Sequence, residues 1–234
     1  MAEKKLSSNT RMSKDERVAS ILLKAKQHLR QVGHENFSPV EVAQDCGVSE
    51  ATIYRYFASK QDLLVRVAEF WVEELLAGSP VLNKNDSIYD RLRQVVRYSL
   101  WVIHSEPALS KFVLIVIRRE PGFRASRIYS LNKRFTSNTT LVVQEAIDQG
   151  VFRNDVPPTM VRNMIFGTIE HEVWSYLLAD GDFSLDESAR LIADIVFKGL
   201  AVEPTINVET FNRSLEAIEK GVRDIDAAVA KLRD

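Results

Sequence analysis

Turn and capping residues between positions 38 and 64 restrict this part of the chain to two short helices joined by a tight turn. Ser38 precedes Pro39, which suits a first helical position because it has no N–H to lose. Glu41 follows three residues after Ser38 and completes a capping-box pattern. Gly47 stands where a left-handed residue would end the helix. A first helix of about two turns is therefore expected here.

Similar signals recur downstream. Ser49 offers a second N-cap, and Ser59 with Asp62 forms another capping box, from which a longer helix is expected to start. In the very short helix between them, Ile53 and Phe57 lie four residues apart and are expected to point together into the core. The other side chains of this helix are expected to face outward: Glu50, Ala51, Thr52, Tyr54, Arg55 and Tyr56.

This outward face carries hydroxyl and guanidinium donors. Such donors suit phosphate oxygens and the acceptor edge of guanine in double-stranded DNA. Short capped helices joined by glycine turns also occur in many other helical proteins, so the turn and caps alone leave a purely structural helix pair open. The donors on the exposed face favour a DNA-reading helix-turn-helix.

The segment GVSEATIYRYFASKQDLL resembles the signature of the TetR family of bacterial transcriptional regulators. Upstream, ERVASILLKAKQHLRQVG resembles the first helix of that family, so the similar stretch runs from Ser13 to Leu64. By position, the resemblance implies backbone or base contacts at Thr52, Tyr54 and Lys60. It also implies a contact from Ser38 at the start of the second helix and a variable base-reading role for Arg55. With the outward side chain of Tyr56, the expected DNA-binding residues are Ser38, Thr52, Tyr54, Arg55, Tyr56 and Lys60.

The charge distribution agrees in sign with a DNA-binding end. The net charge of the 234-residue chain is −1, but residues 1 to 60 contain ten Lys and Arg against seven Asp and Glu. Some of the cations form either a basic arm that adds phosphate contacts or a solvated tail: Lys4, Lys5, Arg11, Lys14 and Arg17.

The rest of the chain has the apolar spacing of amphipathic helices. A first helix is expected between Ser13 and Gly33, and a fourth from Lys60 to Ala77. The run KFVLIVIRRE is read as a buried helix, because a lone strand would leave its backbone groups unpaired. Further helices are expected at 86–104, 107–119, 122–149, 158–180 and 184–202.

The resemblance implies that the middle helices enclose a pocket for a small effector. The candidate wall residues are Leu100, Trp101, Ile103, His104, Phe112, Ile115, Val116, Arg119, Phe135 and Phe166. Ordinary core packing of these side chains is the alternative. Neighbouring cations form either a site for an anionic effector or a solvated face: Arg118, Arg119, Arg124, Arg127, Lys133 and Arg134.

The body also resembles, more weakly, those members of the family that respond to fatty acyl-CoA. The similar stretches are EPALSKFVLIVIRRE and MVRNMIFGTIEHEVWSYLL. An acyl chain in an apolar pocket, with its phosphates near the arginines, is the effector hypothesis that follows. A different hydrophobic compound is the alternative.

Two features bear on assembly. The resemblance implies that the last two body helices pair with those of a second subunit, as a palindromic operator requires. Residues 204 to 234 add a stripe with alternating spacings of three and four, which predicts either a coiled-coil arm that joins subunits or a helix packed on the body or the partner. The stripe consists of Val208, Phe211, Leu215, Ile218, Val222, Ile225, Val229 and Leu232.

Other classes of protein find little support. The segment HEVWS begins like a zinc-protease helix, but Ser175 stands where the second histidine is needed. Cys46 is the single cysteine, which excludes an internal disulfide. No apolar run reaches the ~18 residues of a membrane span, and the first residues lack a signal-peptide pattern, so a cytoplasmic location without a membrane partner is expected. Neither a cofactor, a metal nor an enzymatic activity is expected.

The sequence thus predicts an all-α protein with a three-helix DNA-binding domain at 13–60, an effector-binding and dimerisation domain at 61–203 and an extra helix at 204–234. Its expected partners are double-stranded operator DNA, a second copy of the chain and a small effector. The expected mechanism is repression by occupancy with effector-controlled release. An activator, or a helical interaction protein without such release, is the alternative.

Overall fold

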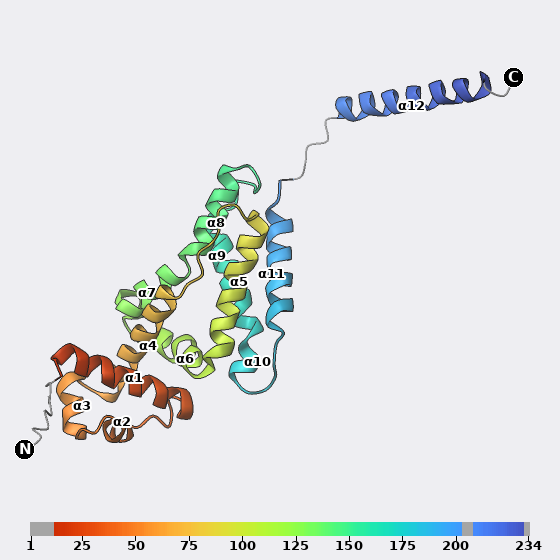
Figure 1. The fold of residues 1–234 in the computed structure, drawn as a ribbon. Helices are drawn as coiled ribbons and strands as arrows, with labels where there is room; N and C mark the ends of the chain where they lie inside the picture. Colours follow the sequence, from red (N-terminus) through yellow and green to blue (C-terminus); the bar gives the residue numbers. More distant parts are fainter. Residues whose placement is uncertain (1–11, 203–207, 232–234) are drawn as a thin grey trace, which may run out of the picture. The chain divides into compact units, whose positions relative to one another are not determined.

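The computed structural model describes residues 12–202 and 208–231, and its regular elements are helical (Figure 1). Three short segments depart from α geometry: the π-helix η1 (Phe112–Val116) and the 3-10 helices η2 (Ile117–Arg119) and η3 (Phe123–Ala125). The α-helices are α1 (Lys14–Val32), α2 (Pro39–Asp45), α3 (Glu50–Tyr56), α4 (Lys60–Ala77), α5 (Ile88–Ser105), α6 (Pro107–Lys111), α7 (Arg127–Phe135), α8 (Ser137–Asp148), α9 (Pro158–Glu172), α10 (Trp174–Leu177), α11 (Leu185–Leu200) and α12 (Val208–Lys231). The predicted all-α class is confirmed.

Local backbone signals account for the first helices. Ser13 and Glu16 form a complete capping box at the start of α1, and Gly33 follows its last residue with φ +74°. Gly47 has φ +63° after α2, a conformation that glycine adopts without steric cost. The Ser49 hydroxyl accepts from the Thr52 amide at the start of α3. These helix boundaries match the sequence predictions.

Two predicted capping boxes form only in part. The Ser38 hydroxyl accepts from the Glu41 amide, but the amide of Ser38 donates to His28 Nε2 at 3.2 Å instead of to Glu41. At α4 the Asp62 carboxylate accepts from the amide of Ala58, 2.8 Å away, one residue before the N-cap. The Ser38 amide and the Asp62 carboxylate, which would have completed the two boxes, thus bond to His28 and to the Ala58 amide instead.

One hydrophobic core contains residues of the first three helices together with residues of α4, α5, α6, α7 and η1. α4 is central to it, because it contacts both α1 and α7 and contributes Leu63, Leu64, Val67, Trp71 and Val72 to this core. Val102 of α5, Leu109 of α6, Phe112 of η1 and Leu131 of α7 extend the same core. The helix-turn-helix is therefore packed continuously onto the body through α4 (Figure 1).

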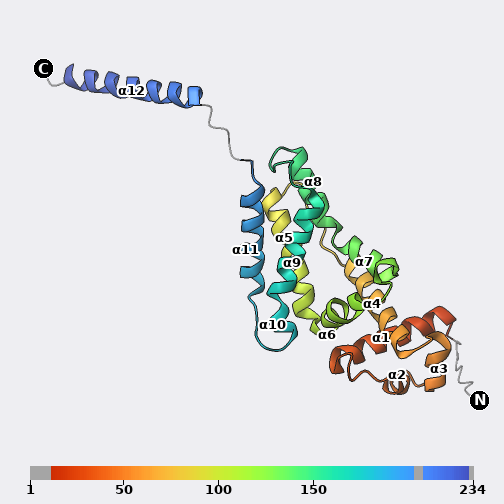
Figure 2. The same cartoon turned by 180° about the vertical axis from the view of Figure 1, so that it is seen from behind.

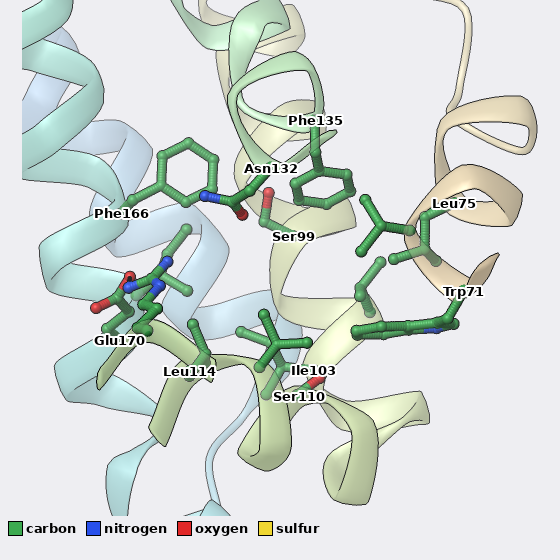
Figure 3. Close-up of a pocket in the computed structure, with 15 residues that line it drawn as sticks. Trp71, Leu75, Ser99, Ile103, Ser110, Leu114, Asn132, Phe135, Phe166 and Glu170 are labelled. Atoms are coloured by element: carbon green, nitrogen blue, oxygen red, sulfur yellow. Dashed lines mark hydrogen bonds and ion pairs between the residues drawn. The ribbon is translucent and has the colours of Figure 1, made fainter. Parts of the chain in front are cut away.

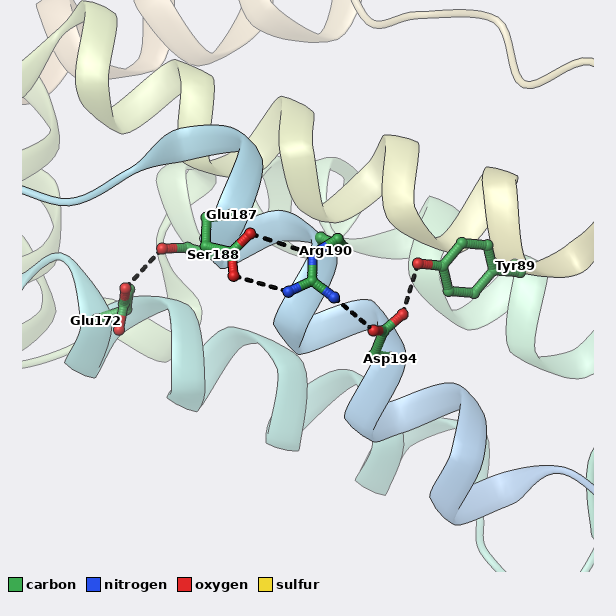
Figure 4. A network of polar contacts seen from close by, with 6 residues as sticks. All are labelled: Tyr89, Glu172, Glu187, Ser188, Arg190 and Asp194. Carbon is green, nitrogen blue, oxygen red and sulfur yellow. Dashed lines mark hydrogen bonds and ion pairs between the residues drawn. The ribbon is translucent and has the colours of Figure 1, made fainter.

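A second core lies among α5, α8, α9 and α11, which Figure 2 shows running alongside one another. Polar contacts fasten α11 within this group. Tyr89 of α5 donates to Asp194 at 2.6 Å, and Ser188 donates to Glu172 of α9 at 2.6 Å (Figure 4). Arg190 pairs with Asp194 within α11 itself. The contacts of Asp194 with Tyr89 and of Ser188 with Glu172 therefore hold α11 to α5 and α9.

Three predicted helices are broken where the sequence suggested continuity. The segment 107–119 is helical but changes from α to π and then 3-10 geometry. The expected helix at 122–149 is wrong as a single element, because Gly122 is left-handed at φ +80° and Ser126 caps a new helix. The expected helix at 158–180 ends at Glu172, and the short α10 follows.

Contacts divide the chain into one compact unit up to Leu200 and a second from Ala201 onward. The second unit contains α12, whose Val208–Lys231 range lies within the predicted terminal helix. Several predicted features fall outside the described residues: Lys4, Lys5, Arg11 and Leu232.

No single helix in the described part of the chain is long and apolar enough to cross a membrane. One pair passes the test of length and composition together, α5 with the segment 107–119, but the two are bent by 102° at their junction.

Candidate functional site

The outward face of α3 presents the expected DNA-reading side chains. Tyr54 is 43% exposed, and Arg55 is exposed with its guanidinium 5.3 Å from the centre of the Tyr56 ring. This contact lies within the range of a cation–π interaction and orients the guanidinium. Tyr54 and Arg55 thus extend donors away from the core, as a helix entering a major groove requires.

The other expected DNA-binding residues are less exposed to solvent. Thr52 is half-buried, and its hydroxyl lies 2.9 Å from that of Ser49. Tyr56 is half-buried and packs against the first core, so only part of it is available to a ligand. Ser38 and Lys60 are half-buried at the starts of α2 and α4. All six residues therefore lie on or beside the two helices of the turn.

The sequence interpretation overlooked His28, which positions α2. It is 5% exposed, its Nε2 accepts from the Ser38 amide, and its ring meets Phe37 edge-on with centroids 5.3 Å apart. Because it lies on α1, its role depends on a contact ten residues away that no local pattern reveals.

Three ion pairs tie the first helix and its loop to the rest of the unit. Lys26 pairs with Glu74 of α4, and Lys111 lies 3.7 Å from Glu35. Arg30 makes two hydrogen bonds to Glu106, one of them 2.8 Å from Nε to Oε2. This bidentate contact raises the pKa of Arg30.

An apolar cavity lies beside α4, with about 580 Å³ of space free of atoms, part of it open to solvent. Figure 3 shows Trp71 and Leu75 of α4 on one side and Phe166 and Glu170 of α9 on the other. The lining consists of Trp71, Val72, Leu75, Ser99, Val102, Ile103, Ser110, Val113, Leu114, Arg118, Asn132, Phe135, Phe166, Ile169 and Glu170. This largely apolar lining with a few polar side chains is typical of small-molecule sites.

Ser110 is an unusual member of this lining. It is 3% exposed, and its Oγ is buried without a hydrogen-bond partner among the described residues. An unpaired buried hydroxyl costs about 1–3 kcal/mol, which a ligand atom in the cavity would recover.

A second, more polar cavity has about 730 Å³ of space free of atoms, part of it open to solvent. It shares four residues with the first: Arg118, Asn132, Phe166 and Glu170. Its own lining adds the cations Lys133 and Arg162, together with Tyr129, Thr136, Asn163 and Gly167. Arg118 pairs with Glu170 where the two cavities join. The arrangement offers an apolar chamber with a cationic extension.

The predicted wall residues divide between this cavity and other surroundings. Phe135, Phe166 and Ile103 line it. Leu100 and Phe112 are fully buried in the two cores, while Ile115 and Val116 are half-buried outside the lining. The exposed or partly exposed residues Trp101, His104 and Arg119 also lie outside it.

Helical phase explains this division. Ser99, Val102 and Ile103 share the face of α5 that meets the cavity, so Leu100 points to the second core. Trp101 stacks on Tyr98 on another face, 5.8 Å between ring centres.

The predicted cation cluster is also split. Arg118 and Lys133 reach the second cavity, whereas Arg127 pairs with Glu73. The exposed side chains of Arg119, Arg124 and Arg134 do not line either cavity. Arg162, which the sequence interpretation overlooked, joins the second cavity from α9.

Within the described residues, no three His, Cys, Asp or Glu side chains form a group that could hold a metal ion. Cys46 is half-buried at the end of α2, and burial raises the pKa of its thiol.

Family models and solved structures agree with this geometry. Residues 21–67 match the model for bacterial regulatory proteins of the tetR family, and residues 85–200 match that of the tetracyclin repressor-like C-terminal domain. The fatty acid metabolism regulator protein of Bacillus subtilis is 19% identical over 177 residues, 75% of this chain and 91% of the relative.

Two solved structures share the fold. The regulator FadR from Bacillus subtilis, in complex with stearoyl-CoA, is 19% identical with a TM-score of 0.66, covering 77% of this chain and 98% of that one. A protein from Saccharomonospora viridis in complex with choline is 20% identical with a TM-score of 0.65, covering 81% and 100%. With both family models matched in order and a helix-turn-helix packed on an all-helical body, the chain belongs to the TetR family of transcriptional regulators.

Proposed function

We propose that this regulator is a repressor that binds a palindromic operator as a dimer and leaves it when an amphipathic anion of the fatty acyl-CoA class fills the body cavities. The observation that carries the effector class is the junction of an apolar cavity with a cationic one through shared residues. Such a shape matches a ligand with a long apolar chain and an anionic head.

The chemistry of the lining supports this ligand. The acyl chain would contact Trp71, Leu75 and Phe135 in the apolar cavity, while Lys133 and Arg162 would face its phosphates. The structural relative solved with stearoyl-CoA supports the same class. Choline, bound in the other relative, is a cation and fits a cationic extension less well.

Exposed apolar side chains on α9 and α11 support the dimer. Met160 and Met164 are 52% and 54% exposed four residues apart on α9, and Leu191 and Ile195 are 44% and 70% exposed four apart on α11. Pairing these helices with those of a second copy would bury them in a four-helix interface. Two α3 helices could then read major grooves about 34 Å apart.

The coupling between effector and DNA is assigned to α4. One helix carries both Trp71 and Leu75 in the cavity and Leu63 and Leu64 in the core of the helix-turn-helix. A ligand that displaces the cavity end of α4 would change the spacing of the two reading helices. Effector and operator would then weaken each other by the same factor.

An operator-binding role implies a cytoplasmic location and needs no cofactor or catalytic residue. Activation of a promoter, or service as a helical interaction protein, is the second candidate. A helical interaction protein would leave the exposed Tyr54 and Arg55 of α3 without a role. An activator without effector-controlled release would leave the joined cavities without one.

Operator binding is tested with promoter fragments from the chain's own gene region. We expect Tyr54→Ala and Lys60→Ala each to weaken binding by about 1–3 kcal/mol, with Lys60→Ala also lowering the salt slope by about 1. Lys84→Ala is the matched control, because Lys84 is exposed in the loop before α5. Equal binding by wild type and both variants would contradict the assigned interface.

The effector class is tested by titration with palmitoyl-CoA. In a Trp101→Phe and Trp174→Phe background, Trp71 is the remaining tryptophan of the three and reports on the cavity directly. We expect its fluorescence to change in step with release of the operator. A complex that persists at saturating palmitoyl-CoA would refute the acyl-CoA class without affecting the DNA-binding assignment.

A further inference from the structure

The terminal helix α12 carries an apolar stripe that is exposed from Phe211 to Ile225. The exposed fractions are 53% for Phe211, 43% for Leu215, 64% for Ile218, 53% for Val222 and 65% for Ile225. Five large apolar side chains on one line of a helix form a contiguous patch rather than scattered surface residues. Such a patch needs a partner.

The spacing of the stripe identifies the kind of partner. Its intervals are four, three, four and three residues, which average 3.5 instead of the 3.6 of a helix laid on a globular surface. A strict 3.5 repeat keeps one seam facing other helices in a left-handed supercoil. The partner that this repeat fits is another copy of α12.

The residue types on the stripe indicate how many copies meet. Leu215 and Val222 occupy the a positions of the heptad, while Ile218 and Ile225 occupy d positions. Leucine at a together with isoleucine at d, as at Leu215 and Ile218, shifts coiled coils from two helices toward three or four. A two-helix coil prefers leucine at d instead.

The residues beside the seam agree with a wider bundle. The g positions hold Ser214 and Gly221, and the sequence continues the pattern with Ala228. Small g residues let neighbouring helices approach more closely than the long charged side chains often found at this position. Gly221 also lowers the intrinsic stability of the helix by about 1 kcal/mol relative to alanine. Packing against other helices has to offset this loss of stability.

We propose that α12 joins two dimers into a tetramer through a four-helix coiled coil, so that one particle carries two operator-binding sites. The a and d residues favour three or four helices, and a particle built from dimers contains an even number of α12 helices. Four helices satisfy both conditions. This inference rests on the dimer of the proposed function.

The test measures the mass of the full chain in solution by sedimentation velocity. We expect the wild type at four times the 26.6 kDa of one chain and Ile218→Asp at twice that mass. Ala217→Asp is the matched control, since it places the same charge one residue away at an exposed c position, and it should remain a tetramer.

A second variant tests the packing argument without adding charge. Ile218→Leu with Ile225→Leu keeps the apolar volume but places leucine at d, so we expect it to shift the population toward dimers. A wild-type mass of two chains, or a tetramer that Ile218→Asp leaves intact, would overturn the proposal. A wild-type mass of one chain would contradict the dimer of the proposed function as well.

A bridging assay separates this inference from operator binding. An immobilised operator should retain a second, labelled operator through wild type and Ala217→Asp but not through Ile218→Asp. Ile218→Asp should still bind single operators with wild-type affinity. Loss of single-operator binding in every protein would refute the DNA assignment, and the mass measurement would still decide the role of α12.

Discussion

Arg118 donates to Glu170 with 2.5 Å between Nη1 and Oε1, and the pair stands where the apolar and cationic cavities join. Arg118 belongs to η2 and Glu170 to α9. Because the two side chains are 28% and 37% exposed, the pair itself adds little to stability. If the proposed anionic effector binds here, its head group would compete with the Glu170 carboxylate for Arg118.

Substitutions of this pair should change ligand affinity in opposite directions. Arg118→Gln removes a cation and should weaken palmitoyl-CoA binding about tenfold, whereas Glu170→Gln frees Arg118 and should strengthen binding severalfold. Arg119→Gln is the control, because Arg119 is exposed and lines neither cavity. Calorimetric titration measures all three, and equal effects of Arg118→Gln and Arg119→Gln would contradict the assigned site.

The contact between Arg30 and Glu106 should contribute measurable coupling energy. Glu106 is only 15% exposed and the hydrogen bonding is bidentate, so we expect about 0.5–1 kcal/mol from a double-mutant cycle of Arg30→Met and Glu106→Gln. The reference cycle uses Arg97 and Asp186, which are 51% and 67% exposed and should give close to zero. Urea denaturation supplies the energies, and indistinguishable cycles would count against a specific tie between α1 and the body.

The buried carboxyl of Glu69 should make the chain less stable at neutral pH. Burial raises the pKa of Glu69 in the folded protein, and its Oε2 has no hydrogen-bond partner among the described residues. A raised folded pKa means that the contribution of Glu69 is favourable below the unfolded pKa and is lost as pH rises through the folded one.

Glu69→Gln should therefore raise the free energy of unfolding by about 1 kcal/mol at pH 7, with a smaller difference near pH 4. Glu73→Gln, one turn along α4, removes an exposed partner of Arg127 and should give no gain. Denaturation curves at both pH values test this. A gain from Glu69→Gln that does not shrink on acidification would contradict the titration argument.

The same substitution should have opposite effects at two glycines. Gly47 has φ +63°, so Gly47→Ala should destabilise the protein by about 1–2 kcal/mol although no atom obstructs the added methyl group. Gly167 lies within α9 without positive φ or obstruction, so Gly167→Ala should stabilise by up to about 1 kcal/mol. Thermal unfolding compares them, and a gain at position 47 would show that the turn tolerates another conformation.

The helix-turn-helix could be predicted in detail because its signals act within a few residues. Ser13, Gly33, Gly47 and Ser49 cap or end helices through their own backbone and side-chain chemistry. The body was less predictable. Gly122 sits at the edge of an apolar, helix-favouring stretch, yet it adopts a left-handed conformation before η3, and no local pattern in the sequence indicates this.

The cavity shows where sequence reasoning ends. Phe135 and Phe166 could be chosen as large apolar residues on predicted middle helices, but the same criterion selected Leu100 and Phe112, which are buried in the cores. Trp71 was overlooked because its helix was assigned a connecting role, and Arg162 because the predicted cation cluster ended at Arg134. Whether an apolar side chain meets a cavity or a core depends on the rotation of its helix relative to several others.

By itself the sequence determined the helical class, the boundaries of α1–α4, the outward face of α3 and the heptad stripe of α12, because these depend on local capping and on periodicity along one helix. Only the tertiary structure decided that α4 connects the reading head to a cavity, and that Arg118 and Glu170 meet where that cavity joins a cationic one. Those features join residues more than 50 positions apart, and their distances are set by packing between helices.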